Sequence, residues 1–227
     1  MKDFYHDLNS AYKQLSIKHK INNLESVLRG DGSKDYWSRL AKGSYFEKLF
    51  TRYKYHFLYE IIGLQSQIHF GILNCLFYRD LISTERGRPN VWNHRFTFMI
   101  ESTIHGIYSY WNRVALVLNT YLKKPKDLKR VYFATVVAQL VVDYPELAQD
   151  QHYQWLQNLK DAVKDLDRNE FAHNNSLIMQ NFLPTDQNFS DFQGLMAMTD
   201  LLLQHNNFIV DEINHLVDLV EKLDKLI

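Results

Sequence analysis

The feature of this sequence that most constrains its fold is a stripe of apolar residues toward its C-terminal end. Ten positions recur there at alternating steps of four and three, and eight of them are apolar: Leu195, Thr199, Leu202, Asn206, Ile209, Ile213, Leu216, Val220, Leu223 and Ile227. This spacing places all ten side chains on one face of an α-helix. We therefore predict one long helix that packs its stripe on a neighbour, with Asn206 either fixing the register or facing solvent near a bend.

A second segment, residues 93–122, has the same helical spacing of apolar side chains. Its stripe consists of Ile100, Ile104, Ile107, Trp111, Val114, Leu118 and Tyr121. Four prolines and the stretch RGDGS (29–33) divide the chain into helical segments of roughly 3–28, 34–82, 93–122, 127–143, 147–173 and 189–226. A total of 8 Gly and 4 Pro in 227 residues is low for an all-β chain, which needs many turns. We therefore predict an all-α fold, an antiparallel bundle of long helices in a single domain spanning 1–227.

Charge and cysteine content exclude several classes of function. Lys and Arg together number 26, as do Asp and Glu, so no overall field attracts nucleic acid or an acidic membrane. The single Cys75 excludes an internal disulfide and a cysteine-based metal site, and there is no HExxH motif or His pair four residues apart. We expect no metal and no cofactor. With no apolar leader and no run of 18 apolar residues, we expect a cytoplasmic protein without a membrane partner.

Three polar features are candidates for binding. Glu101, Tyr108 and Asn112, together with His105, share one face of the second striped segment, which is either its solvent face or the lining of a cleft. The sequence KKPKDLKR (123–130) carries five basic residues and is either a contact for an RNA backbone or a solvated helix start. The sequence TRYKYHFLYE (51–60) interleaves bases with aromatic residues, as a stacking platform would, although the spacing of Tyr55, Leu58 and Ile62 favours core positions.

The stretch DLDRNEFAHNNS (165–176) breaks the pattern of the helix before it. The apolar stripe of Trp155, Leu159 and Leu166, if continued, would place Asn169 and His173 on the packing face. Polar groups on such a face cost free energy unless they find partners or line a wet cleft. The alternative is a helix whose end emerges into solvent. A bare Arg and His five positions apart is common by chance, but an Asn directly after the Arg makes the combination rare.

The sequence RNEFAH (168–173) resembles the R-polar-x3-H signature of the HEPN superfamily (higher eukaryotes and prokaryotes nucleotide-binding). The preceding segment 101–122 is also similar to the long helix before this signature in one bacterial branch. The resemblance implies an all-helical bundle, with residues 91–227 as a HEPN-like core and 1–90 as accessory N-terminal helices. Many members of the superfamily are metal-independent endoribonucleases that act as dimers, with Arg and His of both chains in one cleft. Others have lost activity and bind nucleotides or partner proteins.

This resemblance implies Arg168 and His173 as catalytic residues, and the chemistry agrees. The 2′-OH of RNA is a built-in nucleophile, so cleavage needs mainly proton transfer, which an imidazole with an ordinary pKa of about 6.5 supplies. A guanidinium offers a permanently charged, planar fork to the phosphorane oxygens. Asn169 is placed to hydrogen-bond the imidazole or the phosphate, and Glu101, Tyr108 and Asn112 are the further candidates for substrate binding.

We thus expect a homodimer that binds RNA or a nucleotide and acts as an endoribonuclease, as a toxin or defence effector would, with an antitoxin or another protein as partner. The alternative is a non-catalytic helical module that binds a nucleotide or a protein through the same groove. A third interpretation is a helical interaction protein in which RNEFAH is accidental.

Overall fold

The computed structural model describes residues 2–30, 32, 34–53, 56–84, 88–166, 176–182 and 192–227. Within these ranges every regular element is an α-helix or a 3-10 helix, and there is no strand. The predicted all-α class is therefore confirmed. In the described ranges no helix combines the length and the apolar character that a membrane crossing requires.

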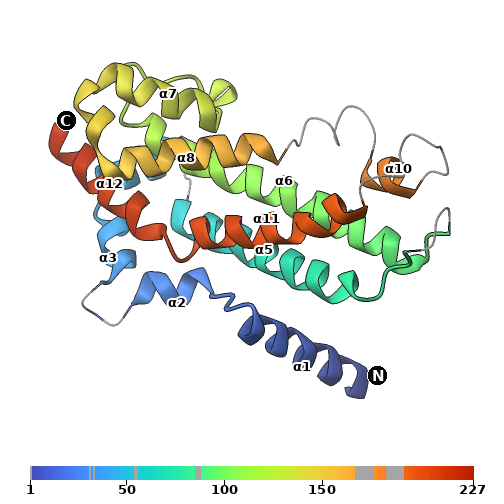
Figure 1. The fold of residues 1–227 in the computed structure, drawn as a ribbon. Coiled ribbons are helices and arrows are strands. Elements are labelled where there is room, and N and C mark those ends of the chain that lie inside the picture. Colours follow the sequence, from blue (N-terminus) through green and yellow to red (C-terminus); the bar gives the residue numbers. More distant parts are fainter. Residues whose placement is uncertain are drawn as a thin grey trace. The chain divides into compact units, whose positions relative to one another are not determined.

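Figure 1 shows the helices in chain order. The α-helices are α1 (Lys2–Lys18), α2 (Leu24–Arg29), α3 (Tyr36–Ala41), α4 (Ser44–Tyr53), α5 (Phe57–Arg79), α6 (Val91–Asn119), α7 (Phe133–Asp143), α8 (Gln151–Asp165), α10 (Leu177–Phe182), α11 (Phe192–Ile209) and α12 (Ile213–Leu226). Two 3-10 helices, η1 (Leu128–Arg130) and η2 (Pro145–Gln149), lie in the connections on either side of α7.

The two apolar stripes are buried as predicted. The six stripe residues of α6 and Tyr121, which follows the helix, are all at most 1% exposed. In the C-terminal stripe the nine positions from Leu195 to Leu223 are buried, and only Ile227 is exposed. Asn206 is also buried, so the alternative that it faces solvent is wrong.

The prediction of one continuous C-terminal helix is wrong. The chain leaves the helix after Ile209 and resumes it at Ile213, and both of these residues are buried. The step from Ile209 to Ile213 keeps the stripe in phase across the break, so the apolar pattern carries no sign of the interruption. The predicted segment 34–82 is likewise divided, into α3, α4 and α5.

The chain forms two compact units built from interleaved segments. Unit 1 comprises Met1–Asn22, Gln67–Gly106 and Leu166–Asn207, and unit 2 comprises Asn23–Ser66, Ile107–Asp165 and Phe208–Ile227. Helices α5, α6 and α11 each contribute residues to both units.

In unit 1, α5 and α6 pack closely and antiparallel. A methyl group on Gly71 would lie 2.1 Å from the Thr103 hydroxyl oxygen, and one on Gly106 would lie 3.1 Å from Ile68. Gly71 of α5 meets Thr103 of α6, whereas Ile68, earlier in α5, meets Gly106, later in α6. Residue numbers fall along α5 as they rise along α6, so the two helices are antiparallel. The missing side chains of Gly71 and Gly106 therefore allow the two backbones to approach. Helix α1 joins this pair through Tyr12, whose hydroxyl donates to Asn74 Oδ1 over 2.7 Å.

In unit 2 the C-terminal half of α6 supplies the centre of the core. Trp111 is fully buried, and its ring lies 5.5 Å from that of Phe133 on α7 and 6.3 Å from that of Trp155 on α8. Helix α12 packs on both α8 and α3. The polar side chains on α6, α7 and α8 are therefore held in place by a shared aromatic core.

Candidate functional site

The centre of the predicted site, Arg168, Asn169 and His173, lies outside the described residues. The description stops at Leu166, directly after α8, and resumes at Ser176, directly before α10. Leu166 and Leu177 on either side are both buried. The chain on both sides of the signature is therefore held in packed structure.

Glu101 on α6 is bonded to the chain just beyond the signature. Its carboxylate accepts a hydrogen bond from the backbone N–H of Leu177, the first residue of α10, over 2.6 Å. A carboxylate that accepts a backbone N–H in the first turn of a helix caps that helix. Glu101 thus lies beside the C-terminal flank of the signature, where its charge has a structural role as a backbone acceptor.

Tyr108 and Asn112 belong to unit 2, whereas Glu101 belongs to unit 1. Both are half-buried. The Oδ1 atom of Asn112 accepts the backbone N–H of Phe133 over 3.1 Å and so satisfies a donor in the first turn of α7. Asn112, which the sequence predicted to bind substrate, therefore has a structural role at the start of α7.

The basic segment 123–130, called here the cationic loop, is ordered by a second asparagine of α6. The Asn119 amide makes two bonds to the backbone of Lys126: Oδ1 accepts its N–H over 2.9 Å, and Nδ2 donates to its carbonyl over 3.0 Å. Lys123, Lys124, Lys129 and Arg130 are exposed. None of the five basic side chains of this loop forms an ion pair within the described residues.

A polar cluster joins α3, α8 and α12 in unit 2. The Nδ1 atoms of His152 and His215 face each other at 3.1 Å, so one ring donates a hydrogen bond to the other. The Nε2 atom of His152 lies 3.9 Å from Asp218 Oδ2. Arg39 donates to both oxygens of Glu221, over 2.6 and 2.9 Å, and to Asp218 over 2.5 Å. These bonds to Arg39 lower the pKa of the Glu221 carboxyl.

The surroundings of the two histidines make this cluster a poor site for phosphate. Glu212 accepts the indole N–H of Trp155, whose ring stacks on His215 with the centroids 5.3 Å apart. Asp150 pairs with Lys222 over 2.6 Å. The cluster thus holds two cations, Arg39 and Lys222, and four carboxylates: Asp150, Glu212, Asp218 and Glu221. This excess of negative charge repels an anion. In the described ranges no three His, Cys, Asp or Glu side chains are arranged to hold a metal ion. The cluster therefore serves to join three helices.

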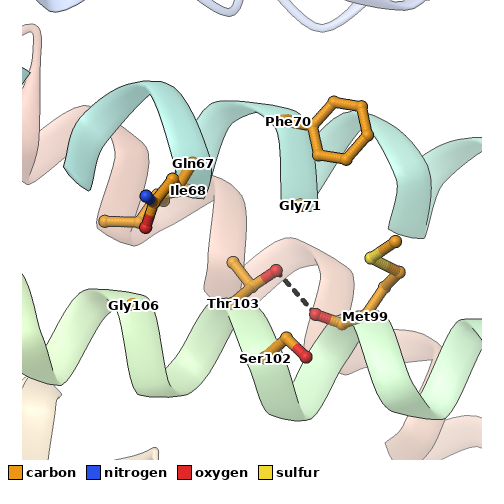
Figure 2. A pocket seen from close by; sticks show the side chains of 8 residues that line it. All are labelled: Gln67, Ile68, Phe70, Gly71, Met99, Ser102, Thr103 and Gly106. Carbon is orange, nitrogen blue, oxygen red and sulfur yellow. Dashed lines mark hydrogen bonds between the residues drawn. The ribbon is translucent and has the colours of Figure 1, made fainter. Parts of the chain in front are cut away.

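A cavity of about 170 Å³ lies between α5 and α6 in unit 1 (Figure 2). It is lined by Gln67, Ile68, Phe70, Gly71, Met99, Ser102, Thr103 and Gly106. The Thr103 hydroxyl donates to the Met99 carbonyl over 2.6 Å, as the dashed line in Figure 2 shows. Since this lining contains no side chain that titrates near neutral pH, the cavity cannot support acid–base catalysis.

A second cavity, of about 280 Å³, lies in unit 2 and has aromatic walls. It is lined by Trp37, Ala41, Phe46, His56, Leu58 and Tyr59. Leu58 is buried, as its helical spacing predicted, whereas Ile62 is only half-buried and Tyr55 lies outside the described residues. Tyr59 is 82% exposed. Aromatic walls of this kind can stack a planar ring such as a nucleobase.

Sequence reasoning missed the histidine cluster and Asn119, and it gave Asn112 a role in substrate binding instead of its bond to the backbone of Phe133. His152 and His215 are 63 residues apart and stand on different helices, so no local spacing connects them. Asn112 and Asn119 are separated by two helical turns on α6, and this spacing is a weak sign that both face the same connection. Comparison of the chain with protein-family models, with curated proteins and with solved structures gives no match.

Proposed function

We propose that this protein is a metal-independent endoribonuclease of the HEPN-like type, with Arg168 and His173 as its catalytic residues. The observation that carries the proposal is the RNEFAH signature between two buried flanks, the second of which is bonded to Glu101 of the preceding long helix. Glu101, which the sequence predicted to bind substrate, is thereby bonded to the chain that follows the signature.

The chemistry assigned to the two residues balances without a metal ion. His173 accepts the proton of the 2′-OH, and the 2′-oxygen forms a bond to phosphorus as the bond to the 5′-oxygen breaks. The products are a 2′,3′-cyclic phosphate and a 5′-hydroxyl end. Arg168 stabilises the charge that builds up on the phosphorane oxygens.

One imidazole cannot take the proton from the nucleophile and deliver another to the leaving oxygen at the same moment. A homodimer places a second His173 in the same cleft, so that one ring acts as base and the other as acid. We therefore propose a homodimer in which both chains contribute to a single cleft.

The test is an RNA cleavage assay with the full chain, in chelator, comparing wild type with Arg168→Ala and His173→Ala. We expect cleavage by wild type and a loss of about 100-fold or more for each variant, since acid–base groups contribute roughly that factor. Intact RNA in every lane would reject catalysis. Equal cleavage by all three proteins would identify a contaminating nuclease.

A second candidate function is a non-catalytic module that binds a nucleotide. The aromatic cavity formed by Trp37, Phe46, His56 and Tyr59 favours it, because stacked rings hold a base without chemistry. If this candidate is right, wild type binds a fluorescent nucleotide and cleaves no RNA. The Trp37→Ala variant then binds the nucleotide with lower affinity than wild type. Binding that is insensitive to Trp37 would reject this candidate.

A further inference from the structure

We propose that the cationic loop, together with Tyr132, is a docking surface for single-stranded RNA. The inference rests on the proposed function in taking RNA as the ligand, but it concerns a part of unit 2 that contains no catalytic residue. Of the two alternatives that the sequence left open, an RNA contact and a solvated helix start, it takes the RNA contact.

The first observation is unneutralised positive charge. Residues 123–130 carry five cations and one acid, Asp127. The carboxylate of Asp127 accepts the backbone N–H of Lys129 over 3.0 Å, and that of the nearby Asp143 accepts the backbone N–H of Lys123 over 2.8 Å. Both acids are thus engaged with the backbone of the loop. Lys123 lies over the ring of Tyr144, with its Nζ atom 5.5 Å from the centroid. The exposed Lys124, Lys129 and Arg130 are left available to phosphates, in a protein whose overall charge is zero.

The second observation is that the loop is held in shape before any ligand arrives. Asn119 fixes Lys126 by two hydrogen bonds, and Asn112 fixes Phe133 at the start of α7. The segment 126–133 is therefore fastened at both ends to a single helix, α6, whose apolar stripe is buried. A binding surface that is already ordered loses less entropy on association than a mobile lysine tail does.

The third observation is an exposed aromatic ring close to the charges in the sequence. Tyr132 follows Arg130 by two residues and is 59% exposed. A row of cations next to an exposed ring is the combination that single-stranded RNA recognises, through its phosphates and its bases. An anionic lipid surface offers phosphates without bases, so the ring favours RNA.

The test measures binding of an uncleavable 2′-O-methyl RNA to the full chain by fluorescence anisotropy at several salt concentrations. We expect Lys124→Glu/Lys129→Glu/Arg130→Glu to weaken binding at least 10-fold. The slope of log K against log salt should fall by about two, because each phosphate contact on a single strand contributes about 0.7. A matched triple variant, Lys34→Glu/Lys42→Glu/Lys164→Glu, reverses three exposed lysines elsewhere in unit 2 and should change both quantities far less.

Tyr132→Ala separates stacking from charge. It should weaken RNA binding about 5-fold or more without changing the salt slope, because base–aromatic stacking contributes roughly 1–3 kcal/mol and releases no counterions. Tyr132→Phe, which keeps the ring and removes only the hydroxyl, should bind RNA as wild type does.

The outcomes separate this inference from the proposed function. If wild type cleaves RNA but the two triple variants bind alike, the docking surface is rejected and the ribonuclease stands. If wild type binds RNA through the loop but cleaves none, the docking surface stands and the ribonuclease is rejected. Absence of RNA binding, or binding to anionic vesicles in its place, overturns the docking surface.

Discussion

At the scale of single residues, the polar side chains of α6 act mainly on the backbone of neighbouring segments. Glu101, Asn112 and Asn119 accept backbone N–H groups of Leu177, Phe133 and Lys126. Each bond gives a side-chain acceptor to a backbone N–H at the start of a helix or within a loop. A polar stripe on a helix can therefore mark the places where connections are fastened, as well as a cleft.

Cys75 gives a prediction at this scale. The thiol is fully buried on α5, and burial raises its pKa to about 12. Because the thiolate is the reactive form, we expect no reaction of the native protein with an aromatic disulfide reagent at pH 8, and one thiol per chain after denaturation in urea. Rapid stoichiometric labelling of the native protein would show that Cys75 is not in the packed core.

At the scale of the helix, the sequence predicts which faces are buried better than where the helices end. The stripes of α6 and of 195–223 follow from spacing alone, since side chains three and four apart share a face. The break after Ile209 does not, because the apolar residues continue in phase across it. Likewise no local pattern could show that Asn119 reaches Lys126, since that bond depends on the path of the loop between them.

The close approach of α5 and α6 gives a prediction at this scale. In Gly71→Ala the new methyl group would lie 2.1 Å from the Thr103 hydroxyl oxygen, so the Thr103 side chain or the helix backbones must shift. We expect a loss of about 1–3 kcal/mol in the free energy of unfolding, measured by urea denaturation. Adding Thr103→Ala removes the clashing oxygen and should recover part of this loss.

Gly63→Ala on the same helix is the matched control. A methyl group there would meet nothing within 4 Å. This substitution should stabilise the protein by about 0.5–1 kcal/mol, because Ala has the higher helix propensity. Equal changes in the free energy of unfolding for Gly71→Ala and Gly63→Ala would show that α5 and α6 are not in tight contact at Gly71.

At the scale of the whole molecule, a net charge of zero conceals two opposite environments within unit 2. The cationic loop carries exposed cations without described carboxylate partners, whereas the cluster around His152 and His215 has more carboxylates than cations. The field of a protein is felt locally, so a neutral chain can still bind an anionic polymer at one surface. The composition correctly excluded an overall basic field but could not locate this surface.

The activity proposed for this chain is cleavage of RNA by attack of the RNA's own 2′-OH. The most direct measurement compares two RNAs that are identical except for a single 2′-deoxy nucleotide at the mapped position of cleavage, incubated with the full chain in chelator. We predict that the all-ribose RNA is cut to a 2′,3′-cyclic phosphate and a 5′-hydroxyl end, and that the deoxy position is not cut. An all-ribose RNA that stays intact, or a deoxy position that is cut at the same rate, would contradict the claim.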